Sequence, residues 1–108
     1  MNYITDKELE NSLSVQIGNY MFAVQFKKGN NILMEKVSDE YQTSLIDAII
    51  TFIEFCRKRQ IQYLTVESRN KSDIYFKIAL RYFPYDSFFM DNNVLRICLD
   101  LDRRKPVR

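Results

Sequence analysis

Few residues in this sequence have the types and spacing that chemistry requires. The chain contains no histidine, the side chain that proteins use most often as a general base and as a metal ligand. Its two cysteines, Cys56 and Cys98, stand far apart in apolar surroundings, which indicates buried thiols rather than a zinc site or an activated nucleophile. A disulfide between them is the alternative. The sequence therefore predicts no catalytic residue and no metal site.

Two glutamates are the best candidates for acid–base chemistry. Glu35 and Glu67 fall near the ends of two predicted strands, 32–37 and 61–67, where a carboxylate could act as a general base. A solvated carboxylate at the end of a strand gives the same pattern and is the simpler interpretation.

Alternating apolar residues predict the elements that would position these side chains. Leu13 to Ile17 and Tyr20 to Phe26 alternate on either side of Gly18-Asn19, a pattern typical of a tight β-hairpin. A second turn at residues 28–31 leads into the strand 32–37, so we expect an antiparallel meander. The spacing of Thr5 and Glu8 matches a capping box and predicts a short helical turn ahead of it.

The period then becomes helical. A long helix is expected over residues 40–59, capped at Ser38 or Asp39, and the strand 61–67 follows it. This strand–helix–strand order predicts that strands 32–37 and 61–67 are parallel. The apolar face of the long helix consists of Leu45, Ile46, Ile49, Phe52, Ile53 and Cys56.

A second helix is expected from Ser72 to about Phe83, where Pro84 ends it. Asp73, Lys77 and Arg81 form its solvated stripe at i, i+4 spacing. Two final strands, 87–90 and 94–101, are predicted around the turn at residues 91–93.

Length and composition describe one small domain. The chain has 108 residues and a net charge of +2, so we expect a single domain over residues 1–108 with a mobile basic tail at 103–108. The near-balanced charge makes nucleic acid an unexpected partner. No apolar run is long enough to cross a membrane and no secretory leader is evident, so a cytoplasmic location and no membrane partner are expected.

From about residue 20 to 101 the chain resembles the GNAT acetyltransferase superfamily. The resemblance depends on the strand–helix–strand core and on an Asn four residues after a strand-ending Val, followed by an aromatic helix. It implies a single α+β GNAT-like domain with a mixed, mostly antiparallel sheet, two main helices and the order βββ-α-β-α-ββ. The most specific stretch reads Ile61-Gln62-Tyr63-Leu64-Thr65-Val66-Glu67-Ser68-Arg69-Asn70.

The residues that work in this family are missing here. GNAT enzymes hold the cofactor pyrophosphate on an R/Q-x-x-G-x-G/A turn at the start of the long helix, where backbone N–H groups approach the phosphates. In this sequence Glu40, Thr43 and Leu45 stand at the basic or amide position and at the two glycine positions. The degenerate turn therefore comprises Gln42, Thr43, Ser44 and Leu45. Lys77 stands where the family often has a Tyr general acid.

We therefore expect a non-catalytic GNAT-like binding or regulatory module that contacts a protein partner and has no cofactor. Homodimerisation is also plausible because the final strands leave a sheet edge to cover. The alternatives are a small stoichiometric inhibitor, immunity or mobile-element protein of unrelated α+β fold, and an atypical N-acetyltransferase that uses acetyl-CoA. The family's splayed central strands would form a ligand or partner cleft lined by Glu35, Val37, Glu67, Asn70 and Tyr75.

Overall fold

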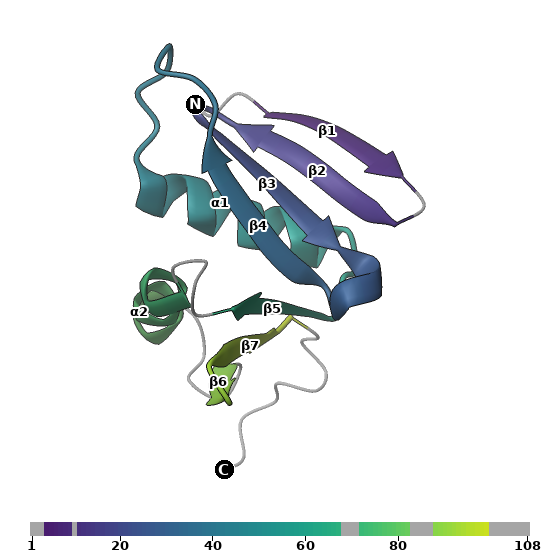
Figure 1. The fold of residues 1–108 in the computed structure, drawn as a ribbon. Coiled ribbons are helices and arrows are strands. Elements are labelled where there is room, and N and C mark those ends of the chain that lie inside the picture. Colours follow the sequence, from purple (N-terminus) through teal and green to yellow (C-terminus); the bar gives the residue numbers. More distant parts are fainter. Residues whose placement is uncertain (1–3, 10, 68–71, 83–87, 100–108) are drawn as a thin grey trace.

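The computed structural model describes residues 4–9, 11–67, 72–82 and 88–99, and within them one mixed sheet carries two helices (Figure 1). The sheet has seven strands in the order β1-β2-β3-β4-β5-β7-β6 in this part of the chain. The predicted tail at 103–108 lies outside the described residues. The elements are β1 (Ile4–Leu9), β2 (Ser12–Ile17), β3 (Tyr20–Gln25), a 3-10 turn η1 (Phe26–Lys28), β4 (Asn31–Lys36), α1 (Leu45–Lys58), β5 (Tyr63–Glu67), α2 (Ser72–Tyr82), β6 (Phe88–Asp91) and β7 (Val94–Cys98).

The first four strands form an antiparallel meander. The β2–β3 hairpin turns at Gly18-Asn19 as predicted, with Ile17 opposite Tyr20 and Gly18 at a φ of 57°. The predicted helical turn at residues 5–8 is wrong, because these residues belong to β1 and pair with β2 over its whole length. A capping box is a weak local signal, and a full ladder of backbone hydrogen bonds to a neighbouring strand overrides it.

Helix α1 starts later than the sequence pattern indicates. Its N-cap is Ser44, whose hydroxyl accepts a hydrogen bond from the Asp47 backbone N–H at 3.1 Å, so the expected start at residue 40 is wrong. The cap predicted at Asp39 is instead an exposed residue whose carboxylate pairs with Lys36 at 2.6 Å. Val37, Ser38 and Tyr41 of the preceding segment hydrogen-bond to Asn19 of the β2–β3 turn instead of forming a first helical turn.

Strands β4 and β5 are parallel, as predicted, but the ladder between them has one paired position only. Asn31 and Thr65 are the single pair of residues in their register. Thr65 strengthens this junction, because its hydroxyl donates to the Gly29 carbonyl at 3.0 Å and its N–H donates to the Asn30 carbonyl at 3.1 Å. β5 then pairs along its length with β7, so the sheet continues across the junction to β6.

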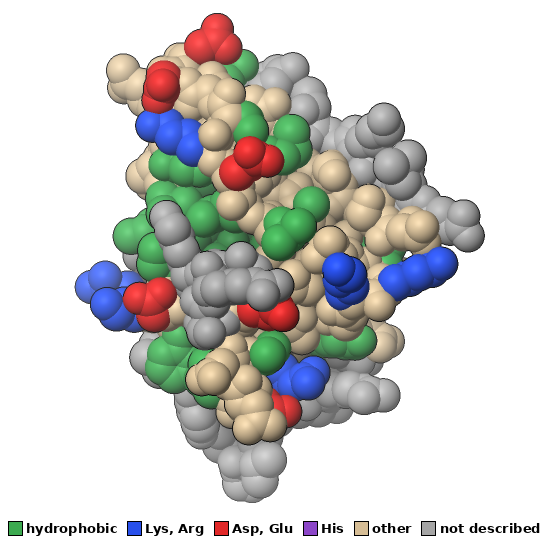
Figure 2. Space-filling model, in the orientation of Figure 1, with side chains coloured by type: hydrophobic (Ala, Val, Ile, Leu, Met, Phe, Trp, Pro, Cys, Tyr) green, Lys and Arg blue, Asp and Glu red, His purple; other side chains and the backbone are tan. Residues whose placement is uncertain are grey.

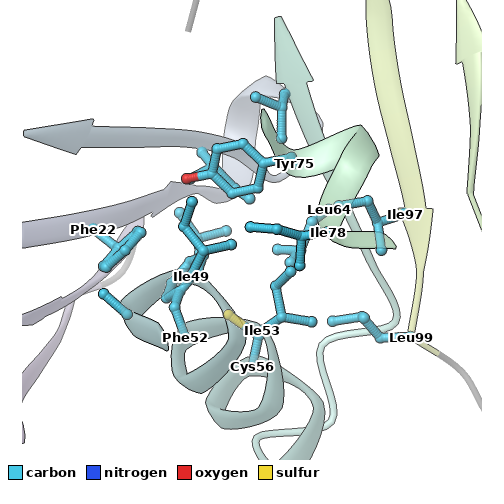
Figure 3. Packing of buried hydrophobic residues seen from close by; sticks show 14 of the residues in the cluster. Phe22, Ile49, Phe52, Ile53, Cys56, Leu64, Tyr75, Ile78, Ile97 and Leu99 are labelled. Atoms are coloured by element: carbon cyan, nitrogen blue, oxygen red, sulfur yellow. The ribbon is translucent and has the colours of Figure 1, made fainter. Parts of the chain in front are cut away.

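The core lies between the sheet and both helices (Figure 3). Alternate residues of β2, β3, β5 and β7 are buried on this side. Phe22 of β3 stacks on Phe52 of α1 with ring centroids 4.5 Å apart. Tyr75 of α2 is fully buried, and its hydroxyl lies 3.7 Å from the Met34 sulfur. Rings bury large areas, so these contacts fix how the helices sit on the sheet.

Burial in this core shifts the titration of two side chains. Both cysteines are free thiols, and Cys56 is buried on α1. Desolvation raises the pKa of the Cys56 thiol to about 12 from an ordinary value of 9.0, although the Arg59 charge opposes it. Desolvation also raises the pKa of Tyr75 well above its usual range. Both groups therefore keep their protons near neutral pH.

The raised pKa of Cys56 predicts a loss of stability in alkali. Between about pH 9 and pH 12 the Cys56 thiol ionises in the unfolded chain but keeps its proton in the folded one. Rising pH therefore stabilises the unfolded state relative to the folded state. One such group lowers the free energy of unfolding by about 1.4 kcal/mol per pH unit in that window. Urea unfolding followed by circular dichroism measures the free energy of unfolding at each pH. This free energy should decline less steeply with pH in Cys56→Ala than in wild type, and Cys98→Ala should keep the full decline. Identical pH dependence in wild type and Cys56→Ala would contradict this interpretation.

Candidate functional site

Asn19 of the β2–β3 turn forms hydrogen bonds with the segment between β4 and α1. Asn19 is 7% exposed. Its side-chain carbonyl accepts the Tyr41 N–H at 2.9 Å, and its side-chain amide donates to the Tyr41 carbonyl at 2.7 Å. Its backbone carbonyl accepts the N–H groups of Val37 at 2.8 Å and Ser38 at 3.3 Å. One buried side chain and its own backbone thus hold both ends of residues 37–41.

Thr43, in the same segment, packs against Gly18 of the β2–β3 turn. A Cβ atom at Gly18 would lie 2.1 Å from the Thr43 hydroxyl oxygen, which real atoms cannot do. Gly18 is therefore required by its positive φ and also by the close approach of Thr43. The Thr43 side chain fills the space beside the hairpin turn.

Three backbone donors around the start of α1 are used within the chain. The Glu40 N–H donates to the Ser38 hydroxyl at 3.0 Å, the Asp47 N–H to the Ser44 hydroxyl, and the Ala48 N–H to the Ser44 carbonyl at 2.9 Å. Asp47 also places a carboxylate in the first turn, where it complements the positive end of the helix dipole. The Asp47 carboxylate and its hydrogen-bonded N–H therefore make this helix N-terminus less attractive to a phosphate.

A groove of about 480 Å³ runs between the start of α1 and α2. Its floor is apolar, and Lys77 and Arg81 of α2 line it as cations. Hydrophobic side chains gather at the left of the molecule in Figure 2, between the start of α1 and α2. The side chains that line the groove are Ser44, Leu45, Ile46, Ile74, Lys77, Ile78 and Arg81.

Ile46 is the groove residue that the sequence pattern misplaced. The helical period assigned it to the core, but its side chain is 48% exposed, while Ala48 and Ile49 are fully buried. The reason is its place in the first turn of α1, next to the groove rather than over the sheet. A large apolar side chain exposed beside a concave apolar surface is typical of a contact site. The predicted solvated stripe at Asp73, Lys77 and Arg81 is exposed, and two of its members line the same groove.

The residues of the predicted cleft lie in separate places. Glu35 lines a shallow hollow of about 130 Å³ on the face of the sheet away from the helices, and Glu67 lines a larger hollow of about 450 Å³ on that face. Val37 is exposed beyond the end of β4, and Tyr75 is buried in the core. Asn70 lies outside the described residues. Of the degenerate turn, Ser44 and Leu45 line the α1–α2 groove, and Gln42 is exposed.

Two findings on the described residues concern metal ions and membranes. That part of the chain has no group of three or more acidic or cysteine side chains placed to hold an ion. Within the same residues, neither helix is long and apolar enough to cross a membrane.

The contacts of Asn19 predict a measurable role in stability. Asn19→Ala removes both side-chain hydrogen bonds to Tyr41 and leaves half-buried backbone groups unpaired, so the free energy of unfolding should fall by about 1–3 kcal/mol. Urea denaturation monitored by circular dichroism measures this loss. Gln42→Ala, an exposed change in the same segment, should stay within about 0.5 kcal/mol of wild type. Equal stability of the two variants would show that Asn19 does not fasten the segment.

The chain was compared with protein families, curated proteins and solved structures. No protein-family model matches the chain, no curated protein matches it, and no solved structure matches it.

Proposed function

We propose that this chain is a non-catalytic binding module on a GNAT-type frame, and that it binds an acidic, apolar-faced segment of a partner protein in the groove between α1 and α2. The observation that carries this proposal is the groove itself. It combines an apolar floor, an exposed Ile46 at its edge and two cations, Lys77 and Arg81, along α2.

The GNAT-type frame is supported by the way the central strands are arranged. β4, α1 and β5 form a parallel strand–helix–strand unit, and β4 and β5 pair only at Asn31 and Thr65, as expected for a family whose central strands splay apart. Helix α2 follows β5 directly, and a hairpin of β6 and β7 completes the sheet. These features agree with the order that the resemblance implies.

Binding through protein contact is favoured over cofactor binding by the segment before α1. The N–H groups of Val37, Ser38, Tyr41 and Asp47 donate within the chain, and Thr43 occupies the space beside Gly18. A pyrophosphate would have to displace these contacts and tolerate Asp47 nearby. Tyr75, the buried tyrosine of α2, is a poor general acid because desolvation raises its pKa.

Energetics favour a partner with both apolar and acidic side chains. Burying a fully exposed large aliphatic side chain contributes about 1.5–3 kcal/mol, and Ile46, which is 48% exposed in the free protein, has about half of that left to contribute to a complex. An exposed ion pair with Lys77 or Arg81 contributes only about 0–1 kcal/mol. The apolar floor therefore supplies the affinity, and the cations select acidic partners and speed their association. A stoichiometric inhibitor would use the same surface.

An atypical acetyl-CoA-dependent N-acetyltransferase is the second candidate. It is favoured by one observation, which is that Lys77 and Arg81 face a groove that begins at the N-terminal end of α1. Cations at that place could attract the phosphates of a cofactor. The two candidates differ in what the groove binds, so ligand titrations separate them.

The protein-binding proposal predicts selective capture of an acidic amphipathic peptide. The probe is an 18-residue peptide, about 27 Å long as a helix, with Leu at i, i+3, i+4 and i+7 and Glu on both flanks. Its titration into labelled protein should shift the methyl resonances of Ile46, Ile74 and Ile78, and the same peptide with Lys in place of Glu should bind at least about tenfold more weakly.

Variants of the groove sharpen this test. Ile46→Asp should weaken binding of the acidic peptide about tenfold or more without unfolding the protein, because the side chain is already half exposed. Lys77→Glu should also weaken it, whereas Lys58→Glu, an exposed change in the last turn of α1, should not. Equal binding of the acidic and basic peptides, or equal effects of Lys77→Glu and Lys58→Glu, would contradict the proposal.

The two candidate functions predict different results when acetyl-CoA or CoA is added to the protein. Isothermal calorimetry with acetyl-CoA and with CoA should give no saturable heat if the donors of the segment before α1 remain used within the chain. Micromolar binding of either compound would overturn the non-catalytic proposal and make acyl transfer the leading function.

A further inference from the structure

A second hollow lies on the opposite side of the sheet, where the described residues place no helix. It encloses about 450 Å³. Figure 2 shows this face of the meander from the front, with charged side chains scattered over a largely polar surface. The side chains and backbone that line the hollow are Gln25, Lys28, Gly29, Asn31, Leu33, Thr65, Glu67, Val94 and Arg96.

The floor of this hollow is one transverse row of polar residues. Gln25 pairs with Asn31, Asn31 with Thr65, and Thr65 with Arg96, across β3, β4, β5 and β7. Cross-strand partners point to the same face of a sheet, so the four side chains stand side by side. Adjacent strands are about 4.8 Å apart, which puts Asn31 and Arg96 about 10 Å apart at the backbone. Because the Arg96 side chain itself spans much of that distance, the space left between it and Asn31 fits only a small ligand.

Asn31 gives the second, independent sign of a ligand. Its side chain is 94% buried, since only 6% remains exposed, and its amide donates to the Gln25 side-chain oxygen at 3.1 Å. Its own carbonyl oxygen, Oδ1, is buried and has no hydrogen-bond partner in the described part of the chain. A buried acceptor without a donor is unfavourable and rare. A donor on a bound molecule would satisfy it.

The charges around the hollow define what that molecule carries. Lys28 and Arg96 line it as cations, and Glu67 lines it as a carboxylate. Arg96 donates from its Nε to the Asp91 carboxylate at 3.4 Å, which is long for a charged pair and uses one of five N–H donors. An anion is attracted by the two cations, but Glu67 disfavours an anion that has no donor group.

We infer that this hollow binds a small organic acid that carries an N–H or O–H donor beside its carboxylate, as amino acids and hydroxy acids do. The carboxylate lies toward Lys28 and Arg96, and the donor lies toward Asn31 Oδ1 and Glu67. Leu33 and Val94 leave an apolar patch for a short side chain. This site goes beyond the partner groove, since it is formed by the other face of the sheet and by different residues.

The test is a nuclear magnetic resonance titration of the full chain with matched pairs of acids. The probes are the free L-amino acids, lactate and malate, each compared with an acid of the same carbon skeleton that lacks the donor, such as propionate for lactate and succinate for malate. A donor-bearing acid should shift the resonances of the Asn31 side-chain amide, Thr65 and the Arg96 Nε, with a dissociation constant of about 1 mM or tighter. The donor-free acid of the pair should bind at least about tenfold more weakly.

Two neighbouring lysines provide the control. Lys27 and Lys28 are both exposed in η1, but only Lys28 lines the hollow. Lys28→Gln should weaken binding about twofold to fivefold, and Lys27→Gln should leave it unchanged. Asn31→Leu should abolish binding; if that variant does not fold, the lysine pair decides the test. No saturable shift with any acid of the panel, equal binding of acids with and without a donor, or equal effects of the two lysine changes would overturn the inference.

Discussion

The hydrogen bonds of Asn19 determine what the rest of this molecule can do. Its buried side-chain amide is hydrogen-bonded to the N–H and the carbonyl of Tyr41. Its backbone carbonyl accepts the N–H groups of Val37 and Ser38, the first two residues after β4. The segment that leads into α1 is thereby fixed to the β2–β3 turn, and Gly18 and Thr43 fit together beside it. This constraint delays the start of α1 to Leu45, which leaves Ile46 exposed at the edge of the α1–α2 groove.

The placement of both helices against one face gives the sheet two different surfaces. On the helix side, aromatic and aliphatic residues such as Phe22 and Phe52 form an apolar core, and the groove opens between the start of α1 and α2. On the other side, polar residues at the single β4–β5 junction form a hollow with an unsatisfied buried oxygen on Asn31. Packing energy is concentrated on the first surface, so the second can hold polar groups that would be costly in a core.

Several parts of this structure could be predicted from the sequence, and their successes have physical causes. Period-2 alternation with Gly18-Asn19 identified the β2–β3 hairpin, and the helix between two apolar strands identified the parallel β4–β5 pair. The start of α1 and the strand β1 were mispredicted because pairing with distant residues decided them. The capping patterns at Asp39 and at residues 5–8 are local and contain no information on Asn19 or on β2. Ile46 and Asn31 were missed as site residues for a related reason, since their importance depends on neighbours in space.

The central claim is that four backbone donors between β4 and α1, those of Val37, Ser38, Glu40 and Tyr41, are already used within the chain. Amide hydrogen exchange of the free protein, read residue by residue by nuclear magnetic resonance, tests it most directly. The account predicts that the N–H groups of Val37, Tyr41 and Asp47 exchange slowly in the free protein and that added CoA leaves their exchange unchanged. Fast exchange of these three amides in the free protein, with protection appearing only when CoA is added, would contradict the account and indicate a cofactor turn that forms around its ligand.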